Sequence, residues 1–327
     1  MKARTLLFAF LLAAGASARA AEPHLAIVSG LGGESYYSDL FHRWATTLNQ
    51  VATTRLGLAP GRVIRLAEDP LRDPEFIEAT STRTNVLEAI HRLADMAGDG
   101  DVVAIVYLGH ATARGNRALL NLPGPDLSAA ALAEALNSLA GRTVVVVLAA
   151  PASGAFVEAL SGPGRVVIAA TASAAENQHT RFGGHFVDAF AENAADLDKD
   201  KRVSLLEAFR YASREVARSF EVEGRIRTEH AVLDDDGDGA GSRDPGAGGG
   251  DGMLAARLHL HAPDAADTAA GGEALALQIE ARRLVDRIEE VKRRKRSLES
   301  ADYFDRLEAL LVELALNRRA YRQERTR

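Results

Sequence analysis

Residues 143–156, TVVVVLAAPASGAF, decide the fold of this chain. Four consecutive valines followed by a leucine indicate a strand buried on both faces, as in a parallel sheet that is covered by helices. The apolar run ends in a turn around Pro151, and a helical segment begins at Ala155. Functional residues of open α/β sheets lie beyond the carboxyl ends of such strands. We therefore expect a functional loop at this turn, where the sequence has a proline.

Strands and helices alternate on both sides of this stretch. Further strands are predicted at residues 24–29, 63–66, 101–108 and 165–171, and helices at residues 85–97, 127–139 and 184–193. This order predicts an α/β fold, a three-layer sandwich with a mostly parallel sheet and right-handed crossovers. Residues 253–261 alternate between polar and apolar side chains, which predicts a closing edge strand.

The first residues predict export. Residues 1–20 have a basic start, an apolar core and the small-residue pattern Ala18-Arg19-Ala20, which is typical of a signal peptide. We therefore expect a periplasmic or secreted protein. No later apolar segment reaches the roughly 18 residues that a transmembrane helix needs, so no transmembrane segment is expected.

Composition excludes several kinds of chemistry. The chain has no cysteine, which excludes disulfides, a cysteine nucleophile and thiolate metal sites. The formal net charge is −6, and an acidic protein is a poor partner for nucleic acid, whose binding depends on basic contacts to phosphate.

The predicted domains are an α/β domain at 21–262, a linker at 263–272 and a helical hairpin or coiled coil at 273–327. In the last segment apolar residues recur in steps of four and three, as in a coiled coil. They include Leu277, Leu284, Ile288 and Val291, and after a break Phe304, Leu307, Leu311 and Leu314.

Two loops carry candidate catalytic residues. Gly109 and His110 follow one buried strand, and residues 150–154 follow the next. Both loops are expected at the same edge of the sheet. A histidine on one loop and a nucleophile on the other would suit covalent acyl transfer, in which the imidazole handles the proton.

These loops resemble the caspase/legumain-like superfamily of cysteine peptidases. Members carry a strand that ends in His-Gly and then a strand that ends in Ala-Cys-x-Ser-Gly or a near variant. The corresponding segments of this chain are Tyr107-Leu-Gly-His-Ala111 and Ala150-Pro-Ala-Ser-Gly154. The resemblance extends to residues 165–171, to the Gly183-Gly184 helix start and, as in bacterial legumain-like proteins, to Leu206-Glu207-Ala208-Phe209. It covers roughly residues 24–261.

The resemblance implies a role for each matching position. The family histidine corresponds to His110, the oxyanion-hole amide to Ala111, and the nucleophile to Pro151. Proline offers neither a thiol nor an N–H group, so thiolate chemistry is absent. The resemblance thus implies a catalytically inactive pseudo-peptidase, a protein-binding or scaffold module whose protein or peptide partner binds in the crevice or on the C-terminal helices.

An alternative is a residual hydrolase. Ser153 would be its nucleophile and His110 its base, provided that the two lie within hydrogen-bond reach. The G-x-S-x-G elbow of α/β-hydrolases is absent from this loop.

Acidic residues predict calcium at two places. In the first, positions 1, 3, 5, 9 and 12 of a calcium-binding loop, with a carbonyl ligand at position 7, correspond to Asp196, Asp198, Asp200, Ser204, Glu207 and Arg202. Lys201 stands at position 6, where glycine is usual, so binding is expected to be weak and structural. The alternative is a capped helix start. A second, poorer candidate comprises Asp234, Asp236 and Asp238.

Overall fold

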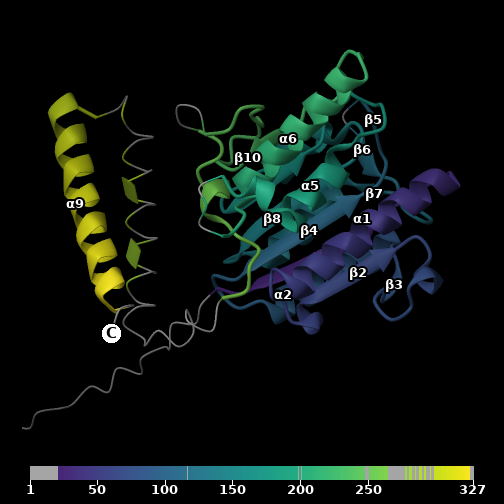
Figure 1. The fold of residues 1–327 in the computed structure, drawn as a ribbon, viewed down its shortest axis with the longest axis horizontal. Helices are drawn as coiled ribbons and strands as arrows, with labels where there is room; N and C mark the ends of the chain where they lie inside the picture. The colour runs from purple at the N-terminus through teal and green to yellow at the C-terminus, as the bar shows by residue number, and fades with distance from the viewer. Residues whose placement is uncertain are drawn as a thin grey trace, which may run out of the picture. The chain divides into compact units, whose positions relative to one another are not determined.

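The computed structural model describes residues 21–263 except 116, 198, 200 and 247–249, eight positions between 277 and 295, and residues 298–324. Its main sheet has seven strands in the order β10-β9-β8-β4-β1-β2-β3 (Figure 1). The strands are β1 (Pro23–Ser29), β2 (Val63–Ala67), β3 (Ala79–Thr80), β4 (Val102–Leu108), β8 (Thr143–Ala149), β9 (Arg165–Ala169) and β10 (Val232–Asp234). Only the β10–β9 pairing is antiparallel among these strands. The predicted mixed α/β fold with a mostly parallel sheet is confirmed.

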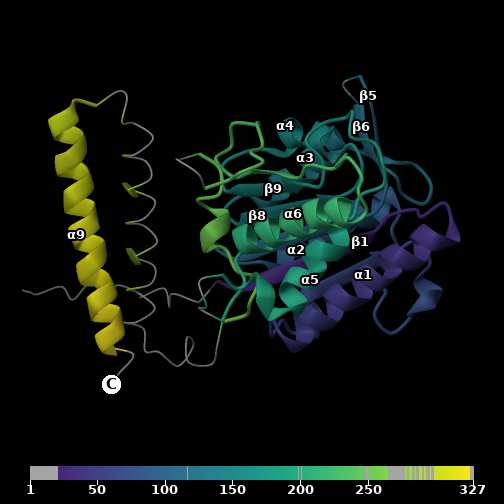
Figure 2. The same cartoon turned by 45° about the horizontal axis from the view of Figure 1, so that its top comes forward.

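Helices cover both faces of this sheet (Figures 1 and 2). One face packs on α1 (Ser35–Thr54), α5 (Phe182–Ala191) and α6 (Leu205–Val222), and the other on α2 (Arg83–Met96), α3 (Ala129–Leu136) and α4 (Val157–Leu160). The valine run of β8 serves both faces because side chains alternate along a strand. Val145 and Val147 join the first core, and Val144 and Val146 join the second.

The strand order changes direction beside β1. From β1 the chain continues to β2 and β3 on one side, whereas β4, β8 and β9 lie on the other. Ligands of open α/β sheets bind at such a change of direction, outside the carboxyl ends of the strands. That point lies between Ser29, the last residue of β1, and Leu108, the last residue of β4.

A second, antiparallel sheet was not predicted. It consists of β5 (Ala111–Arg114), β6 (Arg117–Leu120) and β7 (Leu127–Ser128), and it follows directly after His110. Each of these strands is at most four residues long, so none shows enough alternation to be recognised from sequence. The buried side chains of Leu120 and Leu127 join the core on the α2 and α3 face.

The predicted strand at 253–261 is wrong. This segment forms the 3-10 turn η6 (Ala255–Arg257) and a single bridge between His259 and Ser204. The Asp235 carboxylate accepts hydrogen bonds from the N–H groups of Gly252 and Ala255, which bends the chain into a turn. The edge of the sheet is β10 instead. The other 3-10 turns are η1 (Pro60–Arg62), η2 (Pro70–Arg72), η3 (Asn137–Leu139), η4 (Ser153–Phe156) and η5 (Asn193–Ala195).

Residues Ala21–Ala262 form one compact unit, and Pro263–Arg327 belong to another. The second unit contains α9 (Ser300–Glu324), and within it Leu284 and Ile288 pack on Leu310 of α9. Most of the predicted first helix of the hairpin, the linker after residue 263 and the signal peptide lie outside the described residues. Among the helices that are described, none is both long and apolar enough to cross a membrane.

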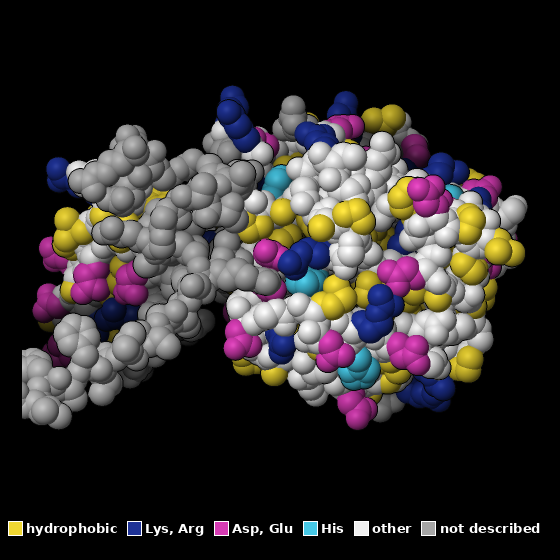
Figure 3. Space-filling model, turned by 90° about the horizontal axis from the view of Figure 1, so that it is seen from below, with side chains coloured by type: hydrophobic (Ala, Val, Ile, Leu, Met, Phe, Trp, Pro, Cys, Tyr) yellow, Lys and Arg dark blue, Asp and Glu magenta, His cyan; other side chains and the backbone are white. Residues whose placement is uncertain are grey.

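Exposed charges of both signs are mixed on the face of the α/β unit that is seen in Figure 3. Acidic and basic side chains lie next to one another there, with histidines among them. This mixture matches the moderate net charge of the chain, and it gives that face no dominant field of one sign.

Candidate functional site

The structure brings the loops of His110 and Pro151 to the same edge of the sheet. Leu108 of β4 pairs with Ala149 of β8, and each candidate residue follows its strand by two positions. The N–H of Gly109 donates to the Ala149 carbonyl across 3.3 Å, which extends the pairing into the loops. His110 therefore follows the strand that borders the change of direction, and Pro151 follows the next strand outward.

Glycines around His110 make room for a tyrosine. The Tyr107 hydroxyl lies 2.7 Å from the His110 carbonyl oxygen and 2.9 Å from that of Asn121. A Cβ atom at Gly30 or Gly109 would come within 2.2 or 2.6 Å of this hydroxyl. These two glycines are thus required by packing, and the buried Tyr107 fixes the backbone at His110.

Aromatic rings surround the half-buried imidazole of His110. Tyr37 and Phe41 of α1 meet it edge-on, with ring centroids 4.7 and 5.1 Å away, and the His179 ring lies at 6.5 Å. Burial lowers the pKa of His110, against the opposing effects of a hydrogen bond with the Gly32 backbone and of the Glu34 carboxylate. Burial, His110 and Arg181 lower the pKa of His179 to about 4. Both rings are therefore neutral at pH 7.

Pro151 is buried, and the turn around it keeps a demanding backbone shape. The next residue, Ala152, has a φ of 53°, in the left-handed region that costs a non-glycine residue roughly 1 kcal/mol. Its N–H donates to the Glu176 carbonyl across 2.8 Å, which holds the turn against the loop that follows β9. The turn is thus maintained although its central residue has no reactive group.

Ser153 supports this turn from within the core. Its side chain is fully buried, and its hydroxyl accepts the Thr171 N–H at 3.1 Å and lies 3.2 Å from the Thr171 hydroxyl. The next residue, Gly154, is confined, because a Cβ atom there would lie 2.3 Å from the backbone of Ala172. This setting favours a supporting role for Ser153 over attack on a substrate.

Ala111, the predicted oxyanion position, is the first residue of β5. It is buried and pairs with Leu120 in the antiparallel ladder. This edge of the sheet thus has a neutral imidazole, which can donate from one nitrogen and accept at the other, on one loop, and on the next loop a buried proline with neither a nucleophile nor an N–H group.

Two carboxylates that the sequence analysis did not single out organise the loop after β9. Glu176 accepts the N–H groups of Ala172 and His230, and its other oxygen lies 2.7 Å from the His230 ring. Glu229 accepts the N–H groups of Arg181 and Phe182 at the start of α5, and burial raises its pKa to about 7. Glu176 and His230 are 54 residues apart, and Glu229 and Arg181 are 48 residues apart, so no local pattern indicated these contacts.

The first predicted calcium loop is only partly described, because Asp198 and Asp200 lie outside the described residues. Asp196 accepts the N–H of Lys201 at 3.0 Å, and Lys201 has a φ of 73° at the position where glycine is usual. At the other end, Ser204 and Glu207 form a capping box at the start of α6. The predicted capped helix start is therefore present. The calcium ligands, with Arg202 at position 7, stay a prediction.

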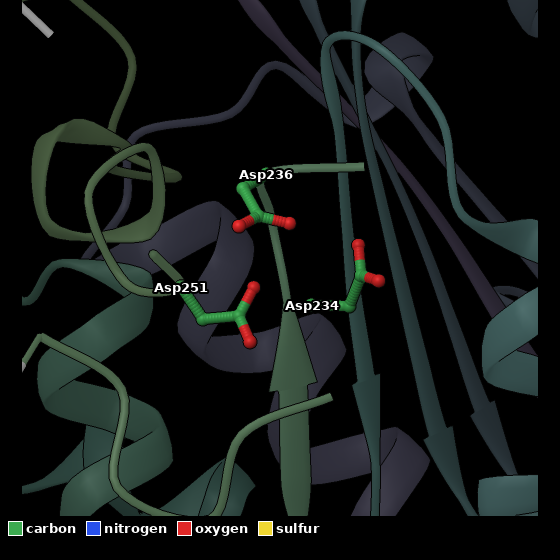
Figure 4. A group of neighbouring side chains, drawn as sticks. All are labelled: Asp234, Asp236 and Asp251. Carbon is green, nitrogen blue, oxygen red and sulfur yellow. The ribbon is translucent and has the colours of Figure 1, made fainter. Parts of the chain in front are cut away.

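The second acidic group differs from the predicted set (Figure 4). Carboxylate oxygens of Asp234, Asp236 and Asp251 all lie within 4.8 Å of one another. Asp238 is outside this group, and its carboxylate accepts the Ala240 N–H instead. Burial and the neighbouring carboxylates raise the pKa of Asp251 to about 6. Sequence spacing could not indicate Asp251, which a glycine-rich loop separates from the others.

The carboxylates of this group accept hydrogen bonds from the surrounding protein. Asp234 is fully buried, and its two oxygens accept hydrogen bonds from the Ser161 hydroxyl and the Gly239 N–H. The Asp251 carboxylate accepts the Asp235 N–H at 3.0 Å. The group can thus hold the loop by itself, and cation binding there stays a prediction.

Comparisons with known proteins identify no family for this chain. No protein-family model matches the chain. No curated protein sequence matches it either. Among solved structures, protein GSU0716 from Geobacter sulfurreducens aligns with a TM-score of 0.43 and 14% identity, over 65% of this chain and 92% of that one. A likeness at this level carries no conclusion about family or activity.

Proposed function

We propose that this protein is an exported, inactive relative of the caspase/legumain-like cysteine peptidases and that its crevice holds a peptide segment of a partner protein. The observation that carries the proposal is the pairing of Leu108 with Ala149. This register aligns the loop of His110 with the turn at Pro151, as catalysis by a histidine and a nucleophile would require. The nucleophile position is filled by a buried residue that cannot attack.

The same geometry supports the proposal of peptide binding without cleavage. Extended peptides bind through main-chain hydrogen bonds and through pockets for their side chains. The crevice supplies a neutral, half-buried imidazole and the aromatic rings of Tyr37 and Phe41. Export rests on the predicted signal peptide in residues 1–20, and the C-terminal helices are a second surface for a partner.

The competing function is hydrolysis by Ser153 with His110 as base. The burial of Ser153 and its two contacts with Thr171 count against it, because attack on a substrate would require the hydroxyl to leave both partners. We therefore treat Ser153 as a residue that shapes the turn.

One peptide pool tests both functions. Degenerate octapeptides are incubated with the protein, retained peptides are recovered by ultrafiltration, and new peptide ends are detected by mass spectrometry. We expect retention without cleavage, in the wild type and in Ser153→Ala alike. Cleavage that disappears in Ser153→Ala would establish the hydrolase, and failure to retain any peptide would refute the binding function.

A further inference from the structure

A polar cavity adjoins the crevice. It has a volume of about 320 Å³ and lies between the carboxyl ends of β1 and β2 and the N-terminal half of α1. Its polar wall includes Ser29, Ser38, Asp39, Glu68, Asp69 and Arg72. Ligand pockets of proteins measure about 300 to 1,000 Å³. The volume therefore suits one long side chain or a small molecule of similar size.

The cavity and His110 share their walls. Phe41 lines the cavity and also meets the His110 ring at a centroid distance of 5.1 Å. The Gly32 N–H donates to Glu68 in the cavity, and the Gly32 backbone also interacts with His110. A segment that lies in the crevice can thus extend one side chain into the cavity.

The charge of the cavity is negative. Asp39 and Arg72 form an ion pair at 2.7 Å and offset one another at the rim. Glu68 and Asp69 form no ion pair with any described residue, so two carboxylates remain uncompensated. The remaining basic group in the wall, His42, is neutral at pH 7 because burial, Arg72 and Arg65 lower its pKa. An anion would be repelled here and a cation attracted.

The wall also holds acceptors without donors. Glu68 is fixed by the Gly32 N–H and the Ser38 hydroxyl, which both donate to Oε2 at 3.0 and 2.8 Å, and Oε1 has no hydrogen-bond partner among the described residues. The Ser29 side chain is 4% exposed and lines the cavity, yet its hydroxyl has no partner within the same residues. The Ser29 hydroxyl has almost no exposed surface of its own, so the carboxylate oxygen of Glu68 is the acceptor that the cavity offers.

The orientation of Ser29 follows from its strand. Leu25 and Ile27, two and four residues earlier in β1, belong to the core on the α1 face. Side chains alternate along a strand, so the Ser29 hydroxyl also points to the α1 face, where the cavity lies. Ser29 and Glu68 thus border the cavity at the ends of two neighbouring strands.

We propose that this cavity binds a lysine or arginine side chain of the peptide segment held beside His110. The ammonium or guanidinium group donates to Glu68 Oε1, with Asp69 adding charge at the opening. This assignment rests on the proposed peptide-binding function and names the side chain that the crevice selects.

A positional peptide array tests the assignment. Octapeptides fixed at one position and degenerate at the others are probed with the labelled protein, with Glu68→Gln and with the control Glu88→Gln. Glutamine at 68 keeps an oxygen for the Gly32 and Ser38 donors but removes the charge. Glu88 is an exposed carboxylate on α2, away from the cavity.

We expect sets with lysine or arginine at one position to be enriched about tenfold over glutamine, as for a hydrogen bond to a charged group. The preference should disappear in Glu68→Gln and persist in Glu88→Gln. Peptide retention without a basic preference, or a preference that Glu68→Gln leaves unchanged, overturns the assignment but not peptide binding. If the wild type retains no peptide at all, both the cavity assignment and the peptide-binding function are refuted. Should Glu68→Gln fail to fold, Asp69→Asn replaces it, since asparagine preserves the cap that Asp69 provides to Leu71.

Discussion

Replacing Glu229 by glutamine should change how the stability of the α/β unit depends on pH. The Glu229 side chain is 2% exposed at the start of α5, where Oε1 accepts the Phe182 N–H at 2.8 Å and Oε2 accepts the Arg181 N–H at 2.9 Å. Burial outweighs these hydrogen bonds and raises its pKa from 4.5 to about 7. Glu176 adds repulsion in the same direction. Glutamine does not titrate, and its single amide oxygen can take the place of Oε1, which accepts both the Phe182 N–H at 2.8 Å and the Arg181 N–H at 3.1 Å. The hydrogen bond to Oε2 is lost, and this loss is the same at every pH.

The sign follows from proton binding. Between pH 4.5 and 7 the folded protein holds a proton on Glu229 that the unfolded chain has lost, so the free energy of unfolding falls as pH rises through this range. A pKa raised from 4.5 to about 7 corresponds to about 3 kcal/mol. The free energy of unfolding of Glu229→Gln, minus that of the wild type, should therefore rise by about 3 kcal/mol from pH 4 to pH 8.

The assay is urea unfolding at several pH values, followed by the fluorescence of Trp44, the single tryptophan of the chain. Trp44 suits this purpose because a Cβ atom at Gly184 of α5 would lie 2.8 Å from its ring, so it reports on the helix that Glu229 anchors. The control is Glu223→Gln. Hydrogen bonding to Arg181 lowers the pKa of Glu223, which is therefore ionised throughout pH 5–8 in both states. A stability difference between Glu229→Gln and wild type that stays constant with pH would refute the reasoning.

Three further outcomes are expected. Gly154→Ala forces a methyl group into backbone 2.3 Å away and should cost about 2 kcal/mol or more in urea unfolding, whereas Gly61→Ala, in open space, should be nearly neutral. Ser153→Ala leaves the buried Thr171 N–H without its acceptor and should lower the free energy of unfolding by about 1 to 3 kcal/mol; an unchanged stability would show that this contact is unimportant. If the predicted calcium loop binds its ion, the wild type should melt at a higher temperature in millimolar calcium than in chelator, and Asp196→Asn should abolish this difference. Equal melting temperatures of the wild type in calcium and in chelator would refute the prediction of a calcium site.

The fold could be predicted from sequence where the pattern was local. The valine run at 144–147 and the apolar run at 102–108 indicated buried parallel strands, and both form the centre of the sheet. Their following loops placed His110 and Pro151 at one edge, because parallel strands end on the same side. The predicted edge strand at 253–261 failed because a distant carboxylate, Asp235, bends that segment into a turn.

The surroundings of the site could not be predicted in this way. His179 approaches His110 from the loop after β9, and Glu229 reaches the start of α5 from 47 residues away. The cavity beside the crevice combines Ser29 and Glu68, which are single polar residues at the ends of two strands. These contacts depend on the tertiary fold, so the spacing of the residues along the chain does not indicate them.

The most direct test of an inactivated peptidase site is the reactivity of a thiol introduced at position 151. Alkylation by iodoacetamide at pH 6.5 is compared between Pro151→Cys and Pro151→Cys/His110→Ala, with Ser173→Cys, at an exposed loop position, as the control for ordinary reactivity. A neighbouring imidazole promotes the thiolate, so the single variant should react at least about tenfold faster than the double variant. Ser173→Cys should react equally with and without His110. Equal rates for Pro151→Cys in the presence and absence of His110 would contradict the account.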